Sequence, residues 1–199
     1  MISKKIFNYF LILFLSAGYI GSSFSIEPNI FVQSTVNRAS QALSNDFNRE
    51  QKIEKLKLIA KETVDINGLA FYTLGSNRKN LSADQKKIYI RLFEEYFLKS
   101  FASRLAEYSN PEINVVSQKK INEKYTIVSS LLVATDKRPE VNVDWRIYTK
   151  DPENPLIRDL IIEGLSLART QKEEFNSIIQ SNNGDINALF KNLEEFIKN

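Results

Sequence analysis

The chain has neither cysteine nor histidine. A protein without these residues cannot form a disulfide bond or a Ser–His or Cys–His catalytic pair, and it lacks the usual protein ligands of zinc, copper and haem. Glycine is also scarce, with six residues and no Gly-rich phosphate-binding loop. We therefore expect no metal site and no cofactor, and a binding protein in place of an enzyme.

Two carboxylates stand in unusual places and are the remaining candidates for a catalytic base. Asp65 borders an apolar segment, and Asp159 lies inside the apolar run Leu156–Glu163. Asp159 could instead pair with Arg158 or Arg146, or cap a neighbouring backbone. A structural role is the favoured interpretation of both aspartates.

The N-terminus is typical of an export signal. Two lysines precede an apolar run at Ile6–Ile20, and small residues follow at Ser23 and Ser25. This order predicts a signal peptide at residues 1–25 and a single mature domain at residues 26–199. The alternative, a membrane anchor, would need a span of roughly 20 apolar residues, and this run is short for that.

The absence of cysteine indicates the compartment of an exported chain, and the net charge limits the kind of partner it can bind. An exported chain without cysteine fits a bacterial periplasm better than it fits a small disulfide-stabilised secreted scaffold. Lys and Arg number 27 against 24 Asp and Glu, and the predicted signal peptide carries two of the lysines. The mature domain is therefore almost neutral, which gives no support to a nucleic-acid partner.

Apolar residues recur at helical spacing in three N-terminal segments. These segments are 27–47, 49–63 and 81–108. The last is the longest and carries a wide aromatic stripe, and Ser82 and Gln85 predict a capping box at its start. A second such box at Thr170–Glu173 predicts the start of a later helix.

After residue 110 the pattern changes to the alternation that is typical of strands. Four strands are predicted, at 113–117, 125–134, 141–147 and 156–163. In the third strand, Val143 and Trp145 alternate with Asp144 and Arg146, so one face is apolar and the other is polar. Short connections favour antiparallel pairing. The sequence therefore predicts an α+β domain with a four-stranded, mainly antiparallel sheet and helices packed on its one apolar face.

Three stretches carry motifs of a known family. They are the V-D…A…L-G segment Val64–Gly75, the S-x-x-Q…F…Y helix from Ser82 to Tyr96, and the pair formed by V-D-W-R at Val143–Arg146 and D…E-G-L-S-L at Asp159–Leu167. In this order they resemble the MlaC-type, or toluene-tolerance, family of periplasmic phospholipid-binding proteins. The resemblance extends from about Ile30 to the C-terminus. The chain departs from the family pattern before Asp159, where Asn154-Pro155-Leu156 replaces the usual Trp.

The resemblance implies an NTF2-like α+β fold whose sheet and helices enclose an apolar cavity for acyl chains. It implies a periplasmic carrier that shuttles phospholipid between an outer-membrane lipoprotein–porin complex and an inner-membrane ABC transporter with an MCE-domain ring, and so maintains the lipid asymmetry of the outer membrane. The residues expected to line the cavity are Leu69, Tyr72, Leu92, Phe93, Tyr96, Phe97, Leu131, Val133, Val143, Trp145, Ile147 and Ile162.

Two other functions stay open, because periodicity does not distinguish a filled interior from a lined one. The first is an exported, non-enzymatic protein–protein interaction module with a closed core. The second is an NTF2-like enzyme that uses Asp65 or Asp159 as a base.

Overall fold

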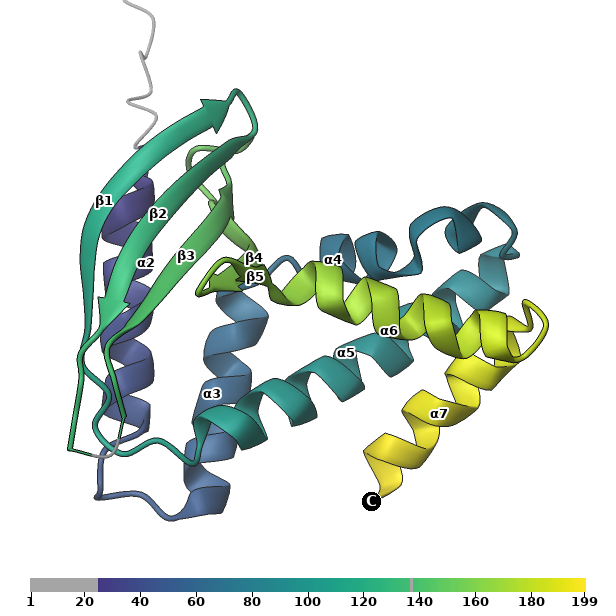
Figure 1. The fold of residues 1–199 in the computed structure, drawn as a ribbon, viewed down its shortest axis with the longest axis horizontal. Coiled ribbons are helices and arrows are strands. Elements are labelled where there is room, and N and C mark those ends of the chain that lie inside the picture. The colour runs from purple at the N-terminus through teal and green to yellow at the C-terminus, as the bar shows by residue number, and fades with distance from the viewer. Residues whose placement is uncertain (1–24, 137) are drawn as a thin grey trace, which may run out of the picture.

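The computed structural model describes residues 25–136 and 138–199 (Figure 1). The predicted signal peptide lies outside the described residues, apart from Ser25. The helices are α2 (Pro28–Ala42), α3 (Arg49–Thr63), α4 (Ile66–Leu74), the 3-10 helix η1 (Gly75–Lys79), α5 (Ala83–Leu105), α6 (Leu167–Ser181) and α7 (Ile186–Lys198). The strands are β1 (Ile113–Asn122), β2 (Tyr125–Leu132), β3 (Val141–Tyr148), β4 (Leu156–Ile162) and β5 (Leu165–Ser166).

The strands form one antiparallel sheet in the order β1-β2-β3-β4-β5. This confirms the α+β class and the antiparallel pairing, but the prediction of four strands is wrong, because the sheet has five. The extra strand arises because Glu163 and Gly164, both at positive φ, turn the chain back. Leu165 and Ser166 then pair with Ile162 and Ile161. The NTF2-like assignment stays a prediction.

Local capping explains where the helices begin. As predicted, Ser82 caps α5, and Gln85 Oε1 accepts a hydrogen bond from the Ser82 backbone N–H at 3.0 Å. The predicted start at Thr170 is wrong. Ser166 caps α6 through a 3.1 Å hydrogen bond from the Arg169 N–H, so the helix begins four residues earlier. Thr170 lies inside the helix, where its hydroxyl donates to the Ser166 carbonyl at 3.1 Å.

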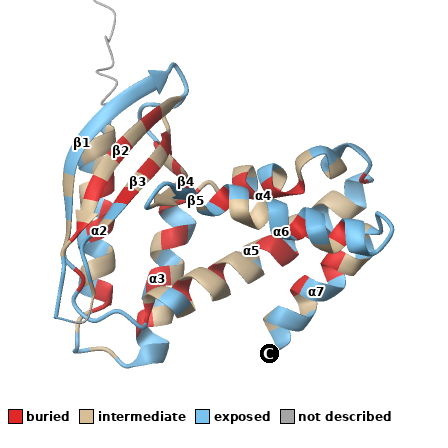
Figure 2. Cartoon of the chain, in the orientation of Figure 1, coloured by how far each residue is buried: buried red, intermediate tan, exposed pale blue. Residues whose placement is uncertain are grey.

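The sheet and the helices share one core. The first three strands curve in front of α2, while α4, α5, α6 and α7 extend to the other side (Figure 1). Figure 2 shows buried residues both in the sheet and in the helices. They form one hydrophobic cluster that joins Val32 of α2, Val128 and Trp145 of the sheet, Leu92 of α5 and Phe175 of α6. A smaller cluster packs the end of α2 against α3 and α5.

Strand β4 fixes the position of α4 at the start of that helix. Arg158 forms an ion pair with Asp65, and Asp65 in turn caps α4 by accepting a hydrogen bond from the Gly68 N–H at 2.8 Å. A Cβ at residue 68 would lie 2.6 Å from Arg158 Nε, so this contact requires glycine. Arg158 also donates to the Tyr125 hydroxyl at 3.2 Å.

The next residue of β4 fixes α6. The carboxylate of Asp159 is almost fully buried and accepts hydrogen bonds from the Ser166 hydroxyl at 2.6 Å and from the Ala168 N–H at 3.0 Å. It also pairs with Arg146 at 3.3 Å. A register shift in β4 leaves Arg158 without a partner residue in β3. We call these contacts of Arg158 and Asp159 the β4 double contact.

We expect Asp159→Asn to lower the free energy of unfolding by about 2–3 kcal/mol, because an amide replaces one acceptor oxygen and leaves a buried donor unsatisfied. Asp144→Asn is the matched control. Asp144 accepts one hydrogen bond, from the Ser129 hydroxyl at 2.6 Å, and an amide oxygen can still accept it. Asp144→Asn should therefore lower the free energy of unfolding by less than about 1 kcal/mol. Urea denaturation of both variants measures the difference, and equal losses would show that Asp159 does not hold α6.

Candidate functional site

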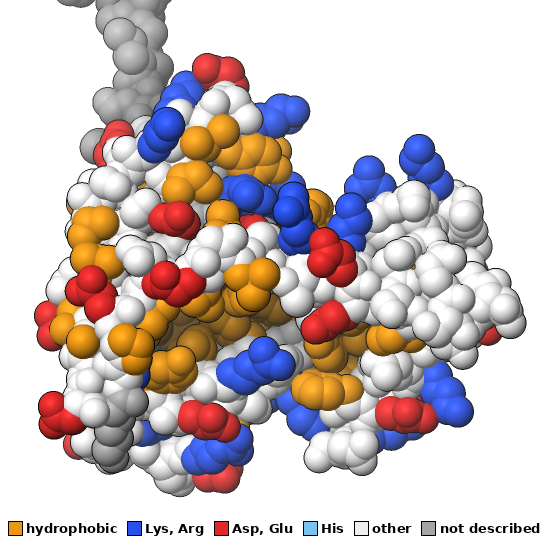
Figure 3. All heavy atoms as spheres, viewed as in Figure 1, with side chains coloured by type: hydrophobic (Ala, Val, Ile, Leu, Met, Phe, Trp, Pro, Cys, Tyr) orange, Lys and Arg blue, Asp and Glu red, His pale blue; other side chains and the backbone are white. Residues whose placement is uncertain are grey.

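An apolar hollow opens on the face shown in Figure 3. It lies between β3 and the helices α3 and α5, and hydrophobic side chains cover its floor. Four apolar side chains of α5, β3 and β4 pack against the core and yet keep part of their surface accessible: Phe97, Phe101, Val141 and Leu160. These residues are the candidates for the lining of the hollow.

Three stacked rings run along α5. Phe93, Phe97 and Phe101 follow each other at intervals of four residues, which places them on one face of the helix. The ring centroids of Phe93 and Phe97 lie 6.1 Å apart, those of Phe97 and Phe101 lie 5.4 Å apart, and both pairs are nearly parallel. Phe93 is 2% exposed, whereas Phe97 and Phe101 are half-buried. This aromatic ladder therefore leads from the closed core to an accessible apolar surface.

The structure brings most of the predicted lining residues together. Eight of the twelve belong to or pack against the main core cluster: Leu69, Leu92, Phe93, Tyr96, Phe97, Val143, Trp145 and Ile147. As predicted, Val143, Trp145 and Ile147 are buried, while Arg146 has 38% of its side chain exposed. Trp145 donates its indole N–H to the Ser130 hydroxyl at 2.8 Å. Contact of these residues with lipid stays a prediction.

The other four predicted residues lie elsewhere. In β2 the buried positions are Thr126, Val128, Ser130 and Leu132, whereas Leu131, expected to line the cavity, is opposite Asn142 on the other face. Val133 lies beyond the end of β2 and, like Ile162, is half-buried. Tyr72 is exposed on α4.

Three candidate lining residues were not predicted from the sequence: Phe101, Val141 and Leu160. Phe101 continues the four-residue spacing of Phe93 and Phe97, so the pattern could have included it. Val141 begins the alternation of β3 and could also have been found. Leu160 gave no signal, because β4 is apolar at most positions and does not reveal its buried face.

Two phenols, the buried Tyr89 and the half-buried Tyr96, connect α5 to its neighbours. The Tyr89 hydroxyl lies 2.8 Å from the Thr73 hydroxyl of α4, and the Tyr96 hydroxyl donates to Gln171 of α6 at 2.9 Å. Burial raises the pKa of Tyr89, although the hydrogen bond to Thr73 opposes the shift. Burial, and then the nearby Glu174 carboxylate, raise the pKa of Tyr96. Both side chains therefore stay neutral at physiological pH.

Both unusual aspartates have structural partners. Asp65 is engaged by Arg158 and the start of α4, and Asp159 by Arg146 and the start of α6. Residues 25–136 and 138–199 contain no cluster of three or more acidic, His or Cys side chains that could hold a metal ion. Within the same residues, no helix is long and apolar enough to cross a membrane.

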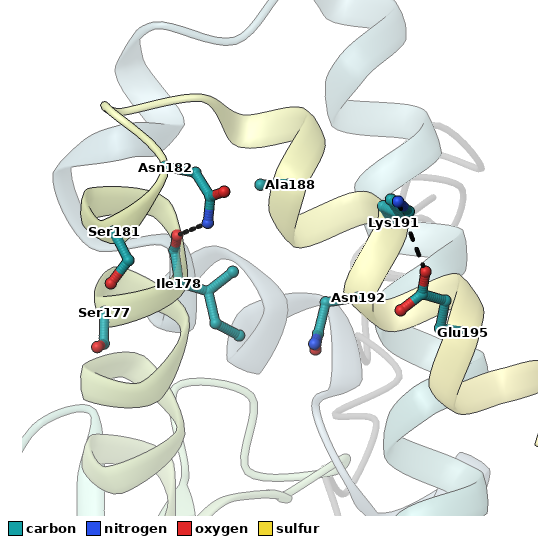
Figure 4. Close-up of a pocket in the computed structure, with 8 residues that line it drawn as sticks. All are labelled: Ser177, Ile178, Ser181, Asn182, Ala188, Lys191, Asn192 and Glu195. Carbon is teal, nitrogen blue, oxygen red and sulfur yellow. Dashed lines mark hydrogen bonds and ion pairs between the residues drawn. The ribbon is translucent and has the colours of Figure 1, made fainter.

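Two further grooves are lined by residues of the helices. The groove between α6 and α7, of about 390 Å³, is mostly polar, with Ser177, Ser181 and Asn192 among its lining residues (Figure 4). A groove of about 670 Å³ between α3 and α5 combines apolar residues such as Leu58 and Leu98 with several lysines. The polar lining of the first groove makes it unsuitable for an acyl chain.

The sequence matches the family model described as MlaC protein over residues 32–195. The chain belongs to the MlaC protein family. A search of curated proteins finds no match. Among solved structures, the chain is similar to a phospholipid-binding protein from Ralstonia solanacearum in complex with a phospholipid, with a TM-score of 0.73 and 18% sequence identity. The similarity covers 87% of this chain and 98% of that one. At this identity it shows that the two share a fold.

The rings of the aromatic ladder of this MlaC family member differ in burial, so their loss should differ in its effect on stability. Phe93→Ala should lower the free energy of unfolding by about 3–5 kcal/mol, because it empties a closed part of the core. Phe101→Ala should lower it by only about 1 kcal/mol, because a half-buried ring loses less apolar contact. Thermal or urea denaturation compares the two variants. Equal losses would mean that the ladder is closed along its whole length.

Proposed function

We propose that the protein is a periplasmic phospholipid carrier that shuttles lipid between outer-membrane and inner-membrane Mla complexes and so maintains the lipid asymmetry of the outer membrane. The observation that carries the proposal is the apolar hollow, with an aromatic ladder leading from it into the core. Membership of the MlaC family and the phospholipid bound to the Ralstonia protein support it.

The physics of the ligand agrees with this kind of site. A diacyl phospholipid has about 30 methylene groups, and each is worth about 0.8 kcal/mol when it is removed from water. A soluble carrier must therefore shelter nearly all of both chains. The charged headgroup is better left in water, because burial of an unpaired charge costs several kcal/mol. The candidate lining residues Phe97, Phe101, Val141 and Leu160 are all apolar, which fits that division.

The second candidate, a protein–protein interaction module with a closed core, is favoured by one observation. Leu92, Phe93 and Ile147, all predicted to line the cavity, are almost fully buried among other side chains. If the hollow is merely a surface depression, the protein should carry no lipid. The carrier proposal requires the hollow to widen when acyl chains enter it.

Native mass spectrometry of the purified protein separates the two candidates. A carrier should retain added mass that solvent extraction identifies as intact phospholipid. Phe101→Glu should abolish that mass while the fold persists, because the half-buried position can admit water beside the new charge. Leu58→Glu is the matched control and should retain lipid, since Leu58 lies in the α3–α5 groove. A bare chain would favour the closed-core module, and recovery of lysolipid would favour an esterase.

Bound lipid should survive prolonged dialysis and a change of pH between about 6 and 8. The sequence has no histidine, the side chain whose unperturbed pKa of about 6.5 would make such a change a switch. Lipid should leave only when the partner complexes, an MCE-domain transporter or a lipoprotein–porin complex, are added. Phospholipid extracted after each treatment measures retention. Loss on dialysis alone would indicate weak, incidental binding.

We also propose that residues 1–25 are a signal peptide and that the mature protein begins near Ile26. N-terminal sequencing of the protein recovered from the periplasmic fraction tests this. A full-length chain recovered with the membranes would indicate an anchor.

A further inference from the structure

One face of α4 is lined by positive charge. Gly68, Tyr72 and Gly75 recur at helical spacing and share this face. A Cβ at residue 68 would lie 2.6 Å from Arg158 Nε, and a Cβ at residue 75 would lie 2.9 Å from Lys172 Cε. Lys172 Nζ also lies over the Tyr72 ring, 5.4 Å from its centroid.

The positive charge continues at both ends of this face. Beyond Gly75, η1 ends with the exposed residues Arg78 and Lys79. On α6, Arg169 precedes Lys172 by three residues, so the two side chains are neighbours. We call Arg78, Lys79, Arg158, Arg169 and Lys172 the cationic row. Figure 3 shows Lys and Arg side chains gathered over this region, from the sheet across α4 toward η1.

Most of this charge is not neutralised within the protein. Arg158 pairs with Asp65, but the other four members form no ion pair with any residue that the structure describes. Glu173, which follows Lys172 in the sequence, is an exposed carboxylate and reduces the local excess. The remaining excess is available to an anionic partner.

Exposed apolar side chains accompany the row. Tyr72 is 38% exposed, and Leu165 and Leu167, which lead into the turn of Arg169, are 58% and 39% exposed. These three residues are not explained by packing within the protein. Both leucines belong to the E-G-L-S-L motif, so part of that motif has no role in the core.

We propose that the cationic row binds the anionic headgroups of a phospholipid surface, with Leu165 and Leu167 entering the interface. Cations around exposed leucines and a tyrosine are the composition that attaches proteins to anionic bilayers. A headgroup layer needs no groove, and the two grooves described above lie on α6–α7 and α3–α5. In Figure 3, Lys and Arg side chains gather over the region of β4 and α4 on the same face as the apolar hollow. Binding through the row therefore brings the hollow to the side that faces the lipid.

This proposal goes beyond lipid carriage and can fail separately from it. The test is co-sedimentation of the purified protein with vesicles of phosphatidylcholine alone or mixed with phosphatidylglycerol. The protein should bind the anionic vesicles and not the zwitterionic ones. Binding should weaken sharply between about 0.1 M and about 1 M salt, where the Debye length falls from about 10 Å to about 3 Å.

The decisive variant replaces Arg78, Lys79 and Arg169 with glutamine. A Lys or Arg near an anionic membrane contributes roughly a fivefold gain in binding, so loss of three should weaken it about 100-fold. The matched control replaces Arg49, Arg104 and Lys119, which are exposed and form no ion pair with the described residues. The control changes the net charge equally and should bind within about twofold of the parent protein. All three proteins share one N-terminus, so that segment contributes equally.

Three results would overturn the proposal: no binding of the parent protein to anionic vesicles, equal weakening of both triple variants, or unchanged binding after loss of the row. If the parent protein does not bind anionic vesicles, an acidic protein surface becomes the alternative partner of the cationic row. A Leu165→Ser, Leu167→Ser variant should also bind more weakly. Native mass spectrometry of the same samples reads lipid carriage separately. A protein that binds vesicles through the row but carries no lipid would contradict the proposed function alone.

Discussion

The β4 double contact determines how the helices are arranged around the sheet. Arg158 holds the start of α4 through Asp65, and the adjacent Asp159 holds the start of α6. Arg158 is the extra residue of a bulge, and bulges commonly redirect a side chain that strand alternation would send to the opposite face. Arg158 stacks on Tyr148, and Asp159 pairs with Arg146, two residues from Tyr148 on the same strand. Two helix starts are thereby fixed from one face of the sheet.

The same contacts give a structural role to four residues of the sequence motifs described above. Asp65, Arg146, Asp159 and Ser166 are all partners in these hydrogen bonds and ion pairs. The sequence showed that Asp159 was unusual, but it left Arg158 and Arg146 as alternative partners. The choice depends on the bulge, which no local pattern in β4 reveals. Buried charges of this kind add little net stability, but removal of one partner is costly. Their role is to specify where α4 and α6 begin.

The limits of the sequence prediction follow from the range of the interactions involved. Helix and strand positions depend on nearby residues, so the α5 capping box and the apolar face of β3 were predictable. The buried face of β2 was not. Ser130 faces the core because its hydroxyl accepts a hydrogen bond from Trp145, fifteen residues away, whereas Leu131 is turned outward. In the same way, Thr170 had the spacing of a cap, but Ser166 took that role after the turn at Gly164 brought it beside Asp159.

The distribution of polar contacts also decides which side of the hollow can move most easily. The helices α4 and α6 are held by directional ion pairs and hydrogen bonds that tolerate little displacement. Beyond Tyr96, which donates to Gln171 of α6, α5 meets its surroundings mainly through the ladder rings and small apolar residues such as Ala102. Its polar tie to α7 is Lys99, which donates to the Ile197 carbonyl at 2.9 Å near the surface. Apolar contacts have no fixed direction. A displacement of this part of α5 therefore breaks fewer hydrogen bonds and ion pairs than a displacement of α4 or α6 from β4. For the proposed carrier, the hollow would therefore widen beside Phe101, at the accessible end of the ladder, while α4 and α6 keep their positions on β4.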